Sequence, residues 1–378
     1  MAAPETTSPM ADVNHARVTA ELGDILALLA AQPSAAFFET GVARVATEWL
    51  RQRGVAVERD AYGNLLARAG GDEGPPLVLM AHMDHPGAHL VGRERARLAG
   101  GVAATALAAG VAVRVIAPRG ERRGRLVDFD AQKRTFRYEG EPLGRGPAFA
   151  VWDLPDLIRD DERWTMRAAD DLMGVTAILW LLGRVARRRT GRPVIGALTR
   201  AEEVGLFGAT LLAQSRRLPA DALVISLEAS RELPGARIGE GPVVRVGDRT
   251  SAFSPSAEAL LTAAAARLAK REAAFRYQRQ LMSGGTCEAT AFTAFGYETG
   301  ALAVPLGNYH NVDPDGLLAA EYVSPHDLTN LALLLRELLR PIPDPQAPIR
   351  QRLARRANAA AARLEATADG FTPPAGRA

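Results

Sequence analysis

The sequence is poor in cysteine, in net charge and in long apolar runs. Cys287 is the only cysteine, so no disulfide can form within the chain, and this suits a reducing compartment such as the cytoplasm. No apolar run reaches the ~18 residues that a membrane-spanning helix needs. The first twenty residues also lack the apolar core of a secretion signal. We therefore predict a cytoplasmic protein that does not associate with membranes.

The formal net charge of +3 comes from one end of the chain. Residues 341–378 contain six arginines and three acidic side chains, whereas basic and acidic residues balance in the rest of the sequence. A basic helical segment at about 348–366 holds most of these arginines. Because the balanced part shows no basic surface, nucleic-acid binding is not expected.

Apolar runs alternate with helical patterns through most of the chain. The runs are 77–81, 194–198, 223–227, 243–246 and 301–305, and the helical patterns cover 15–31, 34–53, 172–189, 256–270 and 326–339. Continuous apolar runs of this length are typical of strands buried on both faces. The alternation predicts an α/β fold with a doubly wound, mostly parallel sheet.

Residues 89–160 have a different pattern. Short strand-like runs at 111–116, 125–129, 135–138 and 148–152 are separated by turns rich in glycine and proline. Short strands with no helix between them are typical of a small barrel or sandwich. We therefore predict three parts. They are a catalytic domain of residues 15–88 and 161–340, a small β-rich, barrel-like insertion of residues 89–160, and a basic Ala/Arg-rich tail of residues 341–378.

Five residues of the metal-ligand type follow strand-like runs. In chain order they are His82, Asp170, Glu203, Glu228 and His310. Ligand sites of open α/β sheets lie beyond the carboxyl ends of the strands, so these side chains are expected to converge. Two histidines and three carboxylates suit zinc, with cobalt or manganese as alternatives. The order predicts a hydrolase in which Asp170 bridges two divalent metal ions.

Each of these residues also has an ordinary explanation when it is taken alone. His82 and His310 could be loop histidines, and Asp170 could cap the helix that follows it. Glu203 could be one of the acids that favour a helix start. Glu228, in contrast, ends an apolar strand, where a buried acid needs a partner such as a metal. The joint order of the five favours the metal site.

Two further acids are predicted to take part in catalysis. Asp84 follows His82 by two positions, and its carboxylate can orient a metal-bound imidazole and raise its basicity. Glu202 directly precedes Glu203, so their side chains point in different directions. Glu203 can then bind a metal while Glu202 faces the bound water. A glutamate in that place can take the proton of the water and pass it to the leaving amine.

Short motifs surround these residues. They are Ala81-His82-Met83-Asp84 with Gly87, Asp170-Asp171 with Gly174, Glu202-Glu203-Val204-Gly205-Leu206-Phe207-Gly208-Ala209, Gly284-Gly285-Thr286, and the turn at His310. Together they resemble the two-metal aminopeptidases of the tetrahedral-aminopeptidase type, which include glutamyl and deblocking aminopeptidases. This chain has Glu228 where the family usually has Asp, and Cys287 where it has another Asp.

The resemblance implies a set of roles. It implies that His82, Asp170 and Glu228 hold one metal and that Asp170, Glu203 and His310 hold the other. It also implies Glu202 as the general base. It further implies a homo-oligomer, with large closed shells among the forms that such enzymes take.

The position of the insertion helps to choose between related enzymes. Carboxypeptidase-like and deacylase relatives usually place their extra domain between the fourth and fifth ligands, whereas tetrahedral-type aminopeptidases place theirs between the first and second. Residues 89–160 lie between His82 and Asp170, so a metallopeptidase that removes N-terminal residues from peptides is expected. A deacylase or carboxypeptidase-like amidohydrolase with the same metals is the alternative enzyme. A non-catalytic binding or scaffold protein on this fold is the alternative of another class.

Overall fold

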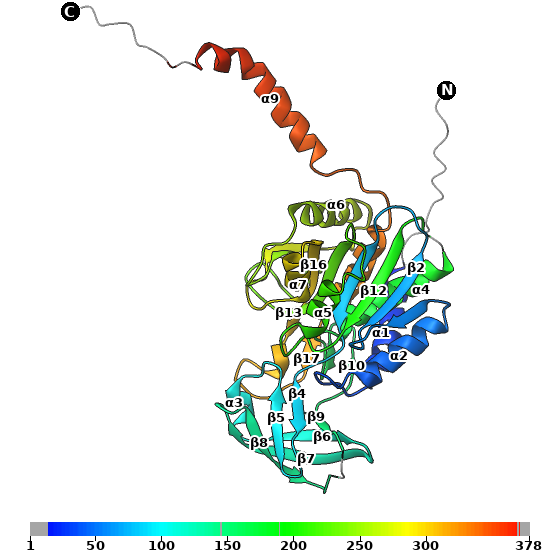
Figure 1. Cartoon of the computed structure of the whole chain (residues 1–378), viewed down its shortest axis with the longest axis vertical. Coiled ribbons are helices and arrows are strands. Elements are labelled where there is room, and N and C mark those ends of the chain that lie inside the picture. Colours follow the sequence, from blue (N-terminus) through cyan, green and yellow to red (C-terminus); the bar gives the residue numbers. More distant parts are fainter. Residues whose placement is uncertain (1–13, 144–145, 189, 369, 371–378) are drawn as a thin grey trace, which may run out of the picture. The chain divides into compact units, whose positions relative to one another are not determined.

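The computed structural model describes residues 14–143, 146–188, 190–368 and 370, which form two compact units. The first unit extends to Arg340 and contains a central sheet, its helices and a barrel (Figure 1). The second unit contains the basic helix α9 (Ala347–Ala366), none of whose side chains is buried. No helix in the described part of the chain is long and apolar enough to cross a membrane.

The central sheet of the first unit has eleven strands. Along its main path lie β1 (Ala56–Arg59), β2 (Leu65–Gly70), β12 (Pro193–Thr199), β3 (Leu77–His82), β13 (Leu223–Arg231), β16 (Glu298–Gly307), β17 (Glu321–Val323), β11 (Trp164–Met166) and β10 (Ile158–Arg159). Two more strands extend from β16, namely β14 (Val243–Gly247) and β15 (Gln278–Leu281).

Strand direction divides this sheet into a centre and two flanks. The four neighbouring strands β12, β3, β13 and β16 are parallel. The hairpin of β1 and β2 joins β12 in antiparallel fashion, and β17, β11 and β10 continue antiparallel on the other side. The predicted α/β fold is therefore confirmed, with a mixed sheet whose parallel part is its centre. The carboxyl ends of the four parallel strands share one edge.

Helices cover both faces of the sheet. They are α1 (His15–Ala30), α2 (Thr40–Arg51), α4 (Leu172–Arg187), α5 (Phe207–Gln214), α6 (Pro255–Arg271), α7 (Glu288–Ala294) and α8 (Pro325–Glu337). Successive side chains of a strand point to opposite faces. On β12, Ile195 and Ala197 join the cluster formed with α5 and α7, whereas a Cβ on Gly196 would collide with Ile178 and Leu182 of α4. Glycine at 196 lets α4 approach the sheet.

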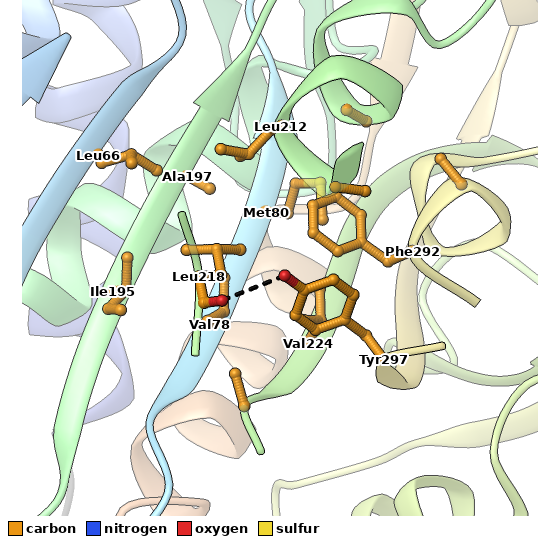
Figure 2. Close-up of a cluster of buried hydrophobic side chains, with 14 residues drawn as sticks. Leu66, Val78, Met80, Ile195, Ala197, Leu212, Leu218, Val224, Phe292 and Tyr297 are labelled. Carbon is orange, nitrogen blue, oxygen red and sulfur yellow. Dashed lines mark hydrogen bonds between the residues drawn. The ribbon is translucent and has the colours of Figure 1, made fainter. Parts of the chain in front are cut away.

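The buried apolar cluster between the sheet and the helices α5 and α7 packs against the central strands. Figure 2 shows Val78 and Met80 of β3 and Val224 of β13 among its members. The rings of Phe292 and Tyr297 meet edge to face at 5.2 Å. The Tyr297 hydroxyl donates a 3.1 Å hydrogen bond to the carbonyl of Leu218, so its polar end is satisfied inside the core (Figure 2).

The helix predicted over residues 34–53 is shorter in the structure and begins at Thr40. Phe37 has a positive φ of 70°, which a helix does not allow. The side chain of Glu39 accepts a hydrogen bond from the backbone N–H of Phe37 and from that of Ala201. The segment before α2 is therefore a turn that Glu39 ties to the loop after β12.

A closed antiparallel barrel lies between β3 and α4 in the sequence. Its strands, in neighbour order, are β4 (Gly87–Leu90), β5 (Arg95–Ala99), β8 (Thr135–Gly140), β7 (Gly120–Asp130), β6 (Val111–Ala117) and β9 (Phe149–Trp152). The short helix α3 (Ala104–Leu107) follows β5, and the interior is filled by apolar side chains such as Val113, Phe136 and Trp152. The predicted barrel-like part is confirmed as a barrel. The exact division into residues 15–88 with 161–340, 89–160 and 341–378 stays a prediction.

Candidate metal centre

The five predicted ligands all lie near the shared carboxyl edge of the parallel strands. His82 is the last residue of β3, and Glu203 lies in the loop between β12 and α5. Glu228 lies within β13, which continues to Arg231 rather than ending at the glutamate. His310 follows β16 in the short 3₁₀ turn Tyr309–Asn311, and Asp170 immediately precedes the cap of α4. The fold therefore brings together side chains that are far apart in the sequence.

Asp170 lies between the two histidines. The Nε2 atom of His82 is 3.3 Å from Asp170 Oδ1, and the Nε2 atom of His310 is 3.7 Å from Asp170 Oδ2. Glu203 Oε2 lies 3.4 Å from His310 Nε2. His82, Asp170 and Glu228 form one group whose ligand atoms lie within 4.8 Å of one another, and Asp170, Glu203 and His310 form another. The two groups share Asp170, through different oxygens.

Backbone carbonyls fix the tautomers of the two histidines. The Nδ1 atom of His82 lies 3.1 Å from the carbonyl oxygen of Asp84, and Nδ1 of His310 contacts the carbonyl oxygen of Gly101 in the barrel. A carbonyl can only accept, so each Nδ1 carries the hydrogen. In the neutral form of each ring, Nε2 is then left with a lone pair directed at the carboxylates, and this is the form that binds metals.

The donor set fits divalent cations. Asp170 Oδ1 and Glu203 Oε1 are buried oxygens that accept no hydrogen bond from the described residues. Burial raises the pKa of Glu202 and of Glu203 well above the ordinary value, and nearby carboxylates raise both further. Burial also raises the pKa of Glu228 to about 7. Cations placed among these acids would relieve the repulsion and satisfy the oxygens.

The charge around His82 supports the same conclusion. Burial alone would lower the pKa of His82, but Glu202, Asp170 and Asp84 raise it well above the ordinary value. In return, contact with His82 holds the pKa of Asp170 below its ordinary value although burial opposes this. A proton on His82 and a metal ion on its Nε2 would therefore compete for the same lone pair.

The loop that carries Glu202 and Glu203 is anchored by Asp84. Asp84 Oδ1 accepts a hydrogen bond of 3.0 Å from the N–H of Glu202, and Oδ2 accepts one of 3.1 Å from the N–H of Glu203. The distance from Asp84 Oδ1 to His82 Nδ1 is 3.7 Å, which is too long for a hydrogen bond between the two side chains. Asp84 instead holds His82 through its carbonyl and the two glutamates through its carboxylate.

Other contacts hold the same loop at its start. Arg200 pairs with the buried carboxylate of Glu39 at 2.7 Å, and its backbone N–H donates to the side chain of Asn64. A Cβ on Gly208 would lie 2.4 Å from the carbonyl oxygen of Arg200, so only glycine fits there. These contacts fix the loop at both ends, at Arg200 and at Gly208, and Glu202 lies between them.

The residues that support the ligands but were not predicted from the sequence are His85, Asn311 and Glu321. His85 contacts the carbonyl oxygen of Asp170 through Nδ1 at 2.6 Å and Asn311 Oδ1 through Nε2 at 2.9 Å. Burial lowers the pKa of His85 to about 4, which keeps the ring neutral. Glu321 accepts hydrogen bonds from the backbone next to Asp170 and His310. Only His85 left a signal, since it follows Asp84 in the segment directly after β3.

Comparison with known proteins agrees with this geometry. Residues 147–323 match the model of the M42 glutamyl aminopeptidase family, and this stretch contains four of the five predicted ligands. Over this stretch, which is a little under half of its length, the chain is similar to the M42 glutamyl aminopeptidases. This match identifies the protein as a hydrolase, and specifically as a metal-dependent aminopeptidase. Neither the amidohydrolase alternative nor the scaffold alternative is favoured by any comparison.

Solved structures of other proteins share the fold. The TET1 peptidase of Pyrococcus horikoshii is 22% identical, with a TM-score of 0.71 over 85% of this chain and 100% of its own. An aminopeptidase from the archaeon Desulfurococcus kamchatkensis is 24% identical, with a TM-score of 0.71 over 85% of this chain and 95% of its own. A TET aminopeptidase from a marine sediment archaeon is 18% identical, with a TM-score of 0.73 over 85% and 97%.

A cleft of about 440 Å³ opens onto the candidate metal centre. Asp170, Glu202, Glu203, Glu228 and His310 line one part of it. Arg231, Arg249, Met282, Tyr309 and the segment 284–287 line another part. The cleft is therefore acidic where the ligands lie and basic where β13 and the loop after β14 end.

Proposed function

We propose that this protein removes N-terminal residues from peptides with two divalent ions held by the five ligands. His82, Asp170 and Glu228 would hold one ion, and Asp170, Glu203 and His310 the other. The observation that carries this proposal is the pair of Nε2 lone pairs directed at different oxygens of Asp170. Zinc is our choice of metal, with cobalt and manganese as alternatives. When bound, the ions would polarise the scissile carbonyl and acidify a water.

Glu202 is proposed as the general base and Asp84 as the residue that places it. Glu202 lines the cleft, and its Oε2 lies 3.9 Å from His82 Nε2, so it borders the ligands without completing either of the two groups described above. Its raised pKa suits a carboxylate that takes a proton from water and returns it to the departing amine. The carboxylate of Asp84 accepts hydrogen bonds from the backbone N–H groups of Glu202 and Glu203, and it thereby fixes the backbone of Glu202 relative to that of Glu203.

The proposed function is tested by metal analysis combined with a peptide panel. Elemental analysis of the purified protein is expected to give two divalent ions per chain. Peptides with a free N-terminus should be cleaved from that end whether the C-terminus is free or amidated, and N-acetylated peptides should resist. Cleavage that requires a free C-terminal carboxylate would favour the carboxypeptidase-like alternative, and release of acetate from acetylated peptides would favour the deacylase.

We also propose that the cleft prefers peptides with an acidic N-terminal residue. Arg231 and Arg249 line the cleft, both are exposed, and neither forms an ion pair with another described residue. Arg231 lies close enough to His310 to lower the pKa of that histidine, after the larger effect of burial. Two unpaired guanidinium groups beside the site offer charge-assisted hydrogen bonds to a substrate carboxylate.

A Glu-p-nitroanilide substrate should therefore be hydrolysed with a higher kcat/KM than Leu-p-nitroanilide. In Arg231→Met/Arg249→Met protein, kcat/KM for the glutamyl substrate should fall about 10–100-fold, because a hydrogen bond to a charged group contributes about 1.5–3 kcal/mol. The leucyl substrate serves as the control and should be little affected. Equal losses for the two substrates would contradict the specificity proposal but not the reaction.

Assembly into a homo-oligomer is a further proposal. One solved relative is described as a dodecamer, and the TET1 peptidase is described as forming a tetrahedron or a large octahedral shell. Sedimentation velocity at micromolar concentration should give a mass several times the 40.3 kDa of one chain. A strict monomer under those conditions would contradict this prediction. The cytoplasmic location likewise stays a prediction.

A further inference from the structure

Glu321, at the start of β17, holds the backbone of two ligand segments with one side chain. Its Oε2 accepts hydrogen bonds of 2.8 Å from the N–H of Ala169 and 3.1 Å from the N–H of Asp170. Its Oε1 accepts a 2.9 Å hydrogen bond from the N–H of His310. Glu321 is fully buried, and no described Lys, Arg or His forms an ion pair with it.

The chemistry of these contacts requires a carboxylate. Both oxygens face N–H groups, and a carboxylate is the side-chain group that can accept at both ends. An amide in its place would turn an NH₂ donor toward one of these N–H groups. A buried carboxylate beside Asp170 is costly, so three backbone donors are needed to compensate it.

The turn at His310 needs such support. His310 and Asn311 have φ values of 55° and 60°, in the left-handed region that side-chain-bearing residues rarely adopt. His85 contacts the carbonyl oxygen of Asp170 and also contacts Asn311. Glu321 and His85 thus connect the Asp170 segment to the His310 turn through two independent links.

We propose that Glu321 is a positioning residue that sets the place of His310 relative to Asp170. This inference rests on the proposed function, in which Asp170, Glu203 and His310 hold the second ion. Glu321 touches none of these three side chains. It acts through the backbone of Asp170 and His310. It therefore controls the affinity of the second ion more than the affinity of the first, because the first ion is also held by His82 and Glu228.

The test compares two buried glutamates. Glu321→Gln keeps the size of the side chain and turns a donor toward either the His310 N–H or the Ala169 and Asp170 N–H groups. Glu337→Gln is the matched control, because Glu337 is equally buried but pairs with Arg267 and Arg271 away from the ligands. Metal-depleted full-length proteins are titrated with Co²⁺ and followed by calorimetry and by visible absorption.

For Glu321→Gln we expect one of the two ions to bind about 10–100-fold more weakly while the other keeps its affinity, as is typical when a partner of a metal ligand is removed. Its kcat should recover when the metal concentration is raised, with little change in KM. Glu337→Gln should bind both ions as the parent does. Two ions bound by Glu321→Gln with unchanged affinities would overturn the inference.

A second variant covers the case in which Glu321→Gln does not fold. Glu321→Asp keeps the charge but shortens the reach, so it should fold and still weaken one ion. If Glu321→Asp binds both ions as the parent does, the positioning role is wrong. If the parent protein itself binds fewer than two ions, the proposed function fails, and that outcome is visible before any variant is made.

Discussion

Replacing Glu202 by glutamine is expected to lower kcat by about 10²–10⁴-fold while the protein folds and keeps both metals, because the variant loses a general acid–base group. Glutamine has nearly the shape of glutamate, and the N–H of residue 202 still reaches Asp84 Oδ1, so the loop should stay in place. Peptide binding should persist, since the cleft residues are unchanged. Steady-state kinetics with metal analysis of the same samples measures both quantities.

A suitable control is Glu288→Gln. Glu288 is fully buried behind the site, where it is hydrogen-bonded to Thr199, and it does not line the cleft. Burial raises its pKa to about 8, so at neutral pH the carboxyl is mostly protonated and resembles the amide. The kcat of the Glu288→Gln protein should therefore stay near that of the parent protein.

Two outcomes would contradict the role of Glu202. A Glu202→Gln enzyme with near-parental kcat and full metal occupancy would exclude it as the base. Loss of a metal from the variant would instead mean that the roles of Glu202 and Glu203 are exchanged. The geometry makes that exchange a concrete alternative, because ligand atoms of His82, Glu202 and Glu203 also lie within 4.8 Å of one another.

Asp170→Ala is expected to remove both metals together and to abolish measurable peptidase activity. Asp170 is the one residue shared by the two three-ligand groups, and its two oxygens face different histidines. Glu228→Ala provides the contrast, because Glu228 belongs to only one of these groups and its loss should release one ion. Elemental analysis after dialysis distinguishes one, two and no ions per chain. Asp170→Ala protein that retained two ions would refute the bridging role.

The convergence of the ligands could be predicted because it follows from strand order. His82 and Glu228 lie on β3 and β13, which are neighbours in the parallel centre of the sheet. Apolar runs locate such strands in a sequence, and parallel strands place their carboxyl ends on one edge. The barrel was predictable for a similar reason, since its short strands are separated by turns and contain no helical pattern.

The residues that hold the ligand segments in place could not be predicted in the same way. Glu321 acts on backbone N–H groups more than 150 residues away, and no spacing rule links a side chain to a distant peptide. The antiparallel edge strands β10 and β11 were missed because they are only two and three residues long. The contact of Asp84 with the Glu202 loop depends on a turn whose positive φ at Ala201 and Leu206 leaves no mark in the pattern.

The contact between His310 and Gly101 would make the barrel part of the proposed metal centre. Gly101 belongs to the barrel segment between β5 and α3, and its carbonyl is what keeps the hydrogen of His310 on Nδ1. A ligand of one part of the chain is thus oriented by the backbone of another. Displacement of this barrel segment would release that hydrogen bond and let the imidazole turn. Contacts made by the barrel with other subunits would then act on metal affinity and so couple assembly to catalysis.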